Sequence, residues 1–281
     1  MVEKNVQVLG KHKKPILTDF HYTKNKVKKP VVILCHGYKG FKDWGALNLV
    51  ATEFAKEGFF LVKFSFSHNG GTVKQPIDFP DLDAFGRNTF SIELDDLQSV
   101  IDEVIQNSKF SNEIDVNNIS LIGHSRGGGI VTIKTNEEPR IKNIISWAGV
   151  SDFKSRFPKG FKLFWWKLRG VAYIINTRTK QKMPHYISFY NDFIKHQDRF
   201  NIQRAVKNLK ANHLMIHGTA DEVVKPQESK DIHIWNSKSK LVLIENMDHA
   251  LGSCQPYLEK QMPEYLRQVV EESISFIHEQ S

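Results

Sequence analysis

Apolar residues form two patterns along the chain. Some occur in short continuous runs, and others recur every three to four residues, the period of an amphipathic helix. The continuous runs predict strands that are buried on both faces of a sheet, at 31–35, 59–66, 119–122, 141–148, 213–217 and 241–245. The helical period predicts helices, at 44–56, 91–106, 125–134, 202–209, 226–235 and 263–278. Because strands and helices alternate, the pattern predicts an α/β protein with a doubly wound, mostly parallel sheet and helices on both faces.

Two stretches depart from this alternation. Residues 1–30 mix short alternating apolar stretches with lysines, which is typical of one or two antiparallel strands at a sheet edge. Residues 67–89 contain a Gly-Gly pair and two prolines and predict a loop.

Length and composition indicate one globular unit. The chain has 281 residues, of which 40% are hydrophobic and 25% charged, so residues 1–281 are expected to form a single large domain. The two cysteines, Cys35 and Cys254, have neither metal-site nor disulfide-framework spacing. No apolar run approaches the length of a membrane span or a signal peptide. We therefore expect a cytoplasmic protein without stable membrane insertion.

The net charge of +8 is concentrated in one segment. Residues 151–200 contain 11 Lys or Arg, three Asp and no Glu, whereas the rest of the chain has 28 basic and 28 acidic residues. The same segment holds 12 of the 31 aromatic residues. No nucleic-acid-binding module surrounds it, so we expect no nucleic-acid partner. The charge is open to three interpretations: attraction of anionic substrates, contact with an anionic membrane surface, or simple solvation of an outer face.

The sequence Gly123-His124-Ser125-Arg126-Gly127 follows a predicted strand and precedes a predicted helix. In this context G-x-S-x-G places a serine on a sharp strand-to-helix turn, where flanking glycines avoid steric collisions. The serine hydroxyl then projects above the sheet, near the positive end of the following helix. The motif therefore predicts a nucleophile at Ser125.

Other reactive groups follow other predicted strands. His36-Gly37-Tyr38 comes after 31–35, Asp221 after 213–217, and Asp248-His249 after 241–245. Active groups of such sheets gather beyond the carboxyl ends of the strands. A nucleophile, an acid and a base thus fall at three strand ends in the order Ser125, Asp221, His249.

This order and placement resemble the α/β-hydrolase family from about residue 30 onward. Within that family the chain is most similar to compact serine esterases related to dienelactone hydrolases, cinnamoyl esterases and single-domain prolyl-oligopeptidase-like enzymes. Dienelactone hydrolases carry cysteine at the turn, where this chain has Ser125. The resemblance implies the α/β-hydrolase fold: a mostly parallel twisted sheet of about eight strands, helices on both faces, and a cap inserted at about 151–200.

The resemblance also implies a role for each matching residue. His249 would take the proton of Ser125, and Asp221 would orient the imidazole. The backbone N–H groups of Tyr38 and Arg126 would form the oxyanion hole. No metal or organic cofactor is implied.

Neighbouring titratable residues have simpler interpretations. Glu222 is an alternative to Asp221 as the orienting acid, although position in the family favours Asp221. Asp248 is expected to be an exposed loop residue. His36 is expected to brace the oxyanion loop, His124 to pack beside the nucleophile, and His217 to pack at a strand end.

Insertions after the strand at 141–148 commonly form a cap over the active site of this fold. We expect the aromatic residues of the cap to line an acyl or aryl pocket, with the loop 67–89 as a second wall. The expected substrate-binding residues are His68, Trp165, Trp166 and Tyr186. The alternative is that the cap aromatics only hold the cap on the main domain.

The predicted function is hydrolysis of small-molecule carboxylic esters. A peptidase or amidase of the same fold would use the same triad but would usually need an anchor for a peptide terminus, such as a pair of carboxylates in the cap. Acyl transfer to another alcohol or thiol and a non-catalytic binding protein are further alternatives. A homodimer is left open.

Overall fold

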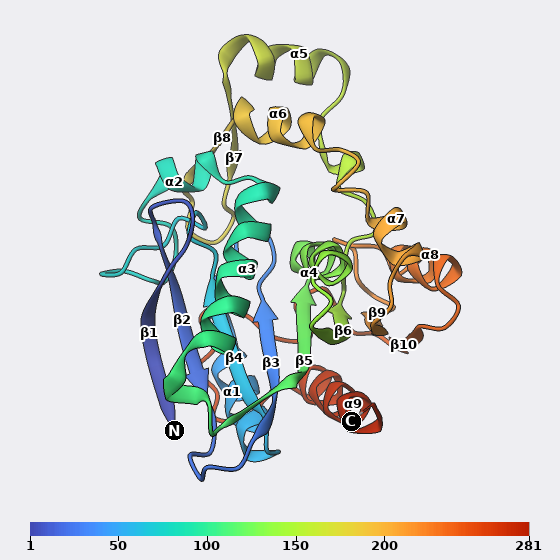
Figure 1. Ribbon diagram of the computed structural model, residues 1–281. Coiled ribbons are helices and arrows are strands. Elements are labelled where there is room, and N and C mark those ends of the chain that lie inside the picture. The colour runs from blue at the N-terminus through green and yellow to red at the C-terminus, as the bar shows by residue number, and fades with distance from the viewer. Residues whose placement is uncertain (281) are drawn as a thin grey trace.

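The continuous apolar runs form the strands of one eight-stranded sheet, in the order β1-β2-β4-β3-β5-β6-β9-β10, in a computed structural model that describes residues 1–280 (Figure 1). The strands are β1 (Val2–Leu9), β2 (Pro15–His21), β3 (Lys29–Cys35), β4 (Phe60–Ser65), β5 (Ile114–His124), β6 (Ile141–Trp147), β9 (Asn212–Gly218) and β10 (Lys240–Ile244). Only β1 with β2 and β2 with β4 pair antiparallel, and the other five neighbouring pairs are parallel. The predicted mostly parallel sheet of about eight strands, with antiparallel strands at the N-terminal edge, is confirmed.

Helices cover both faces of the sheet. One face packs against the helices α3 (Phe90–Gln106), α4 (Arg126–Glu137), α7 (Ile202–Lys207) and α8 (Gln227–Trp235). The other face packs against α1 (Leu47–Lys56) and α9 (Glu264–Glu279). Alternate residues of β3 point to opposite faces, so Ile33 joins the first core and Leu34 the second. A strand with two buried faces needs a continuous apolar run, which is the pattern found at 31–35.

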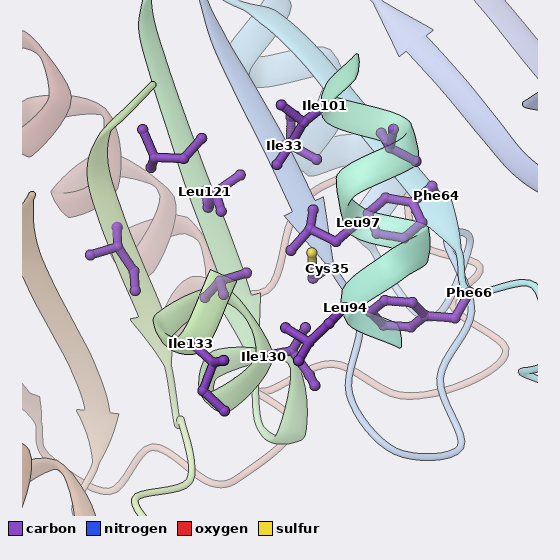
Figure 2. Packing of buried hydrophobic residues seen from close by; sticks show 14 of the residues in the cluster. Ile33, Cys35, Phe64, Phe66, Leu94, Leu97, Ile101, Leu121, Ile130 and Ile133 are labelled. Carbon is purple, nitrogen blue, oxygen red and sulfur yellow. The ribbon is translucent and has the colours of Figure 1, made fainter. Parts of the chain in front are cut away.

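The core on the α3 and α4 side is built from helix and strand side chains that interdigitate. Figure 2 shows Leu94, Leu97 and Ile101 of α3 directed toward Ile33 and Cys35 of β3. All five are fully buried. The Cys35 side chain therefore acts as a small apolar residue in this core.

The region 67–89 differs from the predicted uninterrupted loop. It contains the short helix α2 (Leu82–Arg87), and Asp81 caps this helix by accepting a hydrogen bond from the N–H of Ala84 at 2.9 Å. Six residues with a glycine among them carry too little periodicity to be recognised as a helix from the sequence. Two single-turn 3-10 helices, η1 (Ser108–Phe110) and η2 (Lys154–Arg156), were also not predicted.

Residues 151–200 form a substructure beyond the carboxyl ends of the parallel strands (Figure 1). It contains η2, α5 (Gly160–Arg169), the antiparallel hairpin of β7 (Val171–Ile175) and β8 (Lys182–Tyr186), and α6 (Ile187–Lys195). The base of this inserted segment packs on α3, where the ring of Phe90 stacks on Phe153 with centroids 4.0 Å apart and contacts Phe189 at 4.8 Å. Several of its aromatic side chains thus join it to the main body.

Candidate active site

Ser125 occupies a strained turn between β5 and α4. Its backbone has φ 55° and ψ −121°, a conformation that is rare outside glycine. The two glycines of the motif make this turn possible. A Cβ at Gly123 would lie 2.3 Å from the carbonyl oxygen of Gly127, and a Cβ at Gly127 would lie 2.7 Å from the carbonyl oxygens of Cys35 and His36. Only glycine fits at either position.

The structure brings Ser125, His249 and Asp221 together in one hydrogen-bonded chain. Nε2 of His249 lies 3.0 Å from Oγ of Ser125, and Nδ1 of His249 lies 2.7 Å from Oδ2 of Asp221. The three side chains come from the turn after β5 and from the loops after β9 and β10. The ends of three strands, β5, β9 and β10, therefore supply a hydroxyl, a carboxylate and an imidazole within direct contact.

The carboxylate of Asp221 is held in its ionised form. Burial alone would raise its pKa, but hydrogen bonds from His217, His249 and the backbone N–H of Val224 together hold the pKa well below the usual range. Oδ1 accepts from the N–H groups of Val223 at 2.8 Å and Val224 at 2.9 Å, which leaves Oδ2 facing His249.

The neighbouring acids do not bind the imidazole. The exposed side chain of Glu222 forms no hydrogen bond or ion pair with His249 among the described residues, and Oδ1 of Asp248 accepts a hydrogen bond from the N–H of Gly252 at 2.8 Å. The geometry therefore associates Asp221, and not Glu222 or Asp248, with the imidazole of His249.

Three other histidines near Ser125 hold the loops that carry the candidate residues. Nδ1 of His36 donates to the carbonyl of Gly37 at 2.8 Å, and its Nε2 accepts from the N–H of Phe66 at 3.2 Å. Burial and, secondarily, the charge of Arg126 lower the pKa of His36 to about 4. Its ring thus fixes the loop after β3, as the sequence predicted.

His124 and His217 play similar roles around His249 and Asp221. Nε2 of His124 donates to the carbonyl oxygen of His249 at 2.9 Å, and burial and the nearby His249 lower the pKa of His124 to about 3. Nε2 of the fully buried His217 donates to the carbonyl of Val224 at 2.8 Å, while its Nδ1 lies 2.7 Å from Oγ of Ser229.

The two positions expected to form an oxyanion hole flank Ser125. Arg126 is the first residue of α4, so its backbone N–H has no acceptor within the helix. The loop with Gly37 and Tyr38 passes so close that a Cβ at Gly37 would lie 2.9 Å from Cβ of Ser125. Both N–H groups belong to residues that border the nucleophile.

The side chains of Tyr38 and Arg126 are anchored away from Ser125. The hydroxyl of Tyr38 lies 2.6 Å from Nε2 of His185, a residue of β8 in the inserted segment. Burial, with the charges of Arg126 and Lys39, lowers the pKa of His185 to about 4, so its ring can accept this hydrogen bond at neutral pH. The guanidinium of Arg126 lies 4.8 Å from the centre of the Tyr38 ring and pairs with the buried Glu93 at 2.5 Å.

Ser125 and His249 open into a cavity of about 570 Å³. Apolar side chains contribute much of its wall, namely Leu34, Ala46, Leu47, Trp147, Leu251 and Leu266. Charged side chains from four loops also contribute to its wall, namely Lys39, Arg178, Glu222 and Asp248. Within residues 1–280, no group of three or more His, Cys, Asp or Glu side chains is arranged to hold a metal ion.

The four predicted substrate-binding residues do not line this cavity. Trp165 lies on the outer side of α5, and Trp166 packs inside the inserted segment with its Nε1 donating to the carbonyl of His185 at 2.8 Å. The hydroxyl of Tyr186 donates to Asp83 at 2.9 Å, and His68 is buried with its Nδ1 2.8 Å from Oγ of Ser67. Trp166, Tyr186 and His68 thus bind structural partners, and Trp165 faces outward.

The inserted segment reaches the cavity through a different element, the turn between β7 and β8. Asn176, Thr177 and Arg178 line the cavity there. Sequence reasoning selected aromatic residues and missed this turn, because a short polar turn between two weakly patterned strands has no distinguishing composition. Trp44 and Leu47, at the start of α1, were also missed as cavity residues.

The fold occurs in solved hydrolase structures. The chain is similar over 99% of both chains to Est1E from Butyrivibrio proteoclasticus, with a TM-score of 0.68 and 16% identity. It is similar over 99% of its length to 39% of a puromycin-hydrolyzing peptidase from Mycobacterium tuberculosis, with a TM-score of 0.66 and 14% identity. At these identities the likeness establishes the fold alone, and it confirms the α/β-hydrolase fold.

A curated relative and a family model extend the comparison to sequence. An uncharacterized 31.7 kDa protein of the traX-finO intergenic region of Escherichia coli is 27% identical over 137 residues, which cover 49% of this chain and 43% of that protein. The match thus spans less than half of either protein. The model of the prolyl oligopeptidase family matches residues 54–270, well over half of the chain. The chain therefore belongs to the prolyl oligopeptidase family, whose resemblance was expected from the sequence, and has the α/β-hydrolase fold.

Proposed function

We propose that the protein is a serine esterase that cleaves small-molecule carboxylic esters through an acyl-enzyme on Ser125. The observation that carries this proposal is the hydrogen-bonded chain from Ser125 through His249 to Asp221, located where a cavity of about 570 Å³ meets the strand ends. A hydroxyl that is hydrogen-bonded to an oriented imidazole is the arrangement that nucleophilic acyl transfer requires.

The reaction begins with attack of Oγ of Ser125 on the ester carbonyl carbon. His249 takes the hydroxyl proton on Nε2 as the new carbon–oxygen bond forms. Asp221 accepts the Nδ1–H of the imidazole and stabilises the imidazolium, because its low pKa keeps it ionised. The electron pair of the carbonyl bond moves to the oxygen, which becomes an oxyanion.

The oxyanion is stabilised by the N–H groups of Tyr38 and Arg126, together with the positive end of α4. His249 then gives its proton to the departing alkoxide, which leaves as an alcohol. Water then attacks the acyl carbon while His249 takes its proton. The bond from the acyl carbon to Oγ breaks, and His249 returns the proton to Oγ, which releases a carboxylic acid and regenerates Ser125. An alcohol or thiol in place of this water would make the same site an acyltransferase.

The apolar side chains that line the cavity support an ester with an apolar acyl or aryl group. The acids of the inserted segment do not line the cavity. Asp152 accepts hydrogen bonds from the N–H groups of Lys154 and Ser155, and Asp192 accepts from Ser91. The inserted segment thus lacks a carboxylate pair that faces the cavity, and this favours an ester over a peptide substrate.

A peptidase is the second candidate, favoured by one observation. Glu222 and Asp248 line the cavity beside His249 and form no ion pair with any described residue. Two unpaired carboxylates at that position would attract the ammonium group of a peptide N-terminus. The similarity to a peptidase from Mycobacterium tuberculosis is compatible with this candidate.

Hydrolysis of p-nitrophenyl esters of different chain length and of aminoacyl p-nitroanilides separates the two candidates. The ester proposal predicts turnover of esters only, reduced about 10⁴-fold or more by Ser125→Ala. Anilide turnover that depends on Ser125 and falls in Glu222→Gln or Asp248→Asn would favour the peptidase instead. No turnover of either class by the folded wild type would contradict both and favour a binding protein.

A further inference from the structure

The outer side of α5 carries an apolar stripe that no other part of residues 1–280 covers. Phe161, Phe164, Trp165 and Leu168 follow the i, i+3, i+4, i+7 spacing that normally marks the buried side of a helix. Here they are 72%, 56%, 36% and 64% exposed, whereas Trp166 on the other side of the helix is 5% exposed. We call these four residues the α5 face.

The aromatic rings of the α5 face form one cluster. The ring of Phe161 lies 6.4 Å from that of Phe164 and 5.6 Å from that of Trp165, and the latter two are 5.9 Å apart. Figure 1 places α5 at the end of the molecule that is most distant from α9. A contiguous exposed apolar patch on a projecting helix marks an interaction surface.

The segment that contains the α5 face is basic. Residues 153–191 contain nine Lys or Arg and not one Asp or Glu. Two of the nine, Arg156 and Arg178, pair with Glu228 and Asp78, and the other seven form no ion pair among the described residues. Lys162, Lys167 and Arg169 belong to α5 itself, and the guanidinium of Arg169 lies 4.9 Å from the centre of the Trp165 ring. The partner of this surface must therefore combine apolar groups with negative charge.

We propose that the α5 face docks on the surface of an anionic lipid bilayer. Aromatic side chains on one side of a helix and basic residues along it are the composition of interfacial helices. A ten-residue helix is about 15 Å long, half of a bilayer core, so α5 would lie in the interface and not span it. None of the helices in residues 1–280 has the length and apolar composition needed to cross a membrane.

A second copy of the chain fits this surface less well. Docking two α5 faces together would bring two segments of net charge +8 against each other, and like charges oppose such an approach. The membrane proposal does not depend on the reaction proposed for Ser125, because Ser125 lies in the turn between β5 and α4, outside the inserted segment.

The test is co-sedimentation of the full chain with phosphatidylcholine vesicles, with and without phosphatidylglycerol. We expect binding to the anionic vesicles only, weakened by salt. Lys162→Glu is expected to weaken this binding about fivefold or more, and the double variant F161S/F164S about tenfold or more. The matched controls are Lys238→Glu and the double variant I234S/L258S, which change exposed residues outside the inserted segment and are expected to bind as the wild type does.

Three outcomes would overturn the proposal. In the first, the wild type does not bind anionic vesicles at low salt, and in the second it binds neutral and anionic vesicles equally well. In the third, the two α5 variants bind anionic vesicles as strongly as the wild type does. The alternative is that a second copy of the chain binds the α5 face, and size-exclusion chromatography of the same proteins tests it. A wild-type dimer that F161S/F164S converts to a monomer would identify the α5 face as a subunit interface. Circular dichroism and ester hydrolysis by each variant verify that the changes leave the fold and the site intact.

Discussion

At the scale of single residues, the histidines around Ser125 differ in what their ring nitrogens contact. His36 directs both nitrogens to backbone groups that fix a loop. His217 contacts the Ser229 hydroxyl and the Val224 carbonyl, and its Nε2 also lies 3.3 Å from Oδ2 of Asp221. Of these three histidines, His249 alone contacts the hydroxyl of Ser125, with its other nitrogen on Asp221. In the proposed reaction His249 therefore carries the proton, and Asp221 holds its imidazole.

Asp221→Asn tests that task. The amide keeps the size of the side chain but loses its charge, so it no longer stabilises an imidazolium at His249. If the proposed reaction is correct, kcat/KM for a p-nitrophenyl ester should fall about 10⁴-fold, the effect of the same change at the orienting aspartate of a serine protease. Glu222→Gln, one residue away, is the control and is expected to change kcat/KM little. The assignment of the acid would be wrong if the two variants had exchanged effects.

At the scale of elements, the inserted segment is coupled to the loop that borders Ser125. The hydroxyl of Tyr38 bonds to His185 on β8, and the Tyr38 ring lies against Arg126. The backbone N–H groups proposed to hold the oxyanion thus belong to residues whose side chains are fixed by the inserted segment and by Glu93. Movement of the β7–β8 hairpin would shift one of these two donors.

Tyr38→Phe is expected to loosen the loop without removing its N–H group. We expect kcat for ester hydrolysis to fall about tenfold with little change in KM, because a displaced oxyanion donor weakens transition-state binding selectively. Tyr173→Phe, on the exposed part of the inserted segment, is the control. An unchanged kcat in Tyr38→Phe would show that the Tyr38–His185 contact is purely structural.

Elements with strong local patterns could be predicted from the sequence, and those defined by tertiary contacts could not. The run at 31–35 is apolar because β3 is buried on both faces, and the glycines around Ser125 are required by contacts within 3 Å. The composition of residues 151–200 does not indicate which of their aromatic side chains are buried and which are exposed. Trp165 and Trp166 are adjacent in sequence, yet one faces outward and the other packs inside, and neither reaches the cavity.

At the scale of the whole molecule, the buried core contains a carboxylic acid, Asp96, whose burial lowers the free energy of unfolding at neutral pH. Asp96 on α3 is fully buried, and the N–H of Ser67 donates to its Oδ2 at 2.7 Å, while its Oδ1 has no hydrogen-bond partner among the described residues. Burial raises the pKa of Asp96 to about 7, although the hydrogen bonds from Ser67 oppose this. The folded state therefore binds a proton that the unfolded chain releases at about pH 4.

This difference predicts how stability depends on pH. Between about pH 4 and pH 7 the folded protein holds more protons at Asp96 than the unfolded chain, so this group lowers the free energy of unfolding as pH rises. We expect Asp96→Asn to raise Tm relative to the wild type more at pH 8 than at pH 5, as measured by calorimetry. A Tm difference that is independent of pH would show that Asp96 titrates normally.

The central claim is that Ser125 forms a covalent acyl-enzyme. The most direct measurement is mass spectrometry of the protein after reaction with a fluorophosphonate, followed by mapping of the modified peptide. The account predicts one adduct, located on Ser125, abolished in Ser125→Ala and strongly slowed in His249→Ala. Ester hydrolysis by a protein that remains unlabelled at Ser125, or that is labelled at another residue, would contradict it.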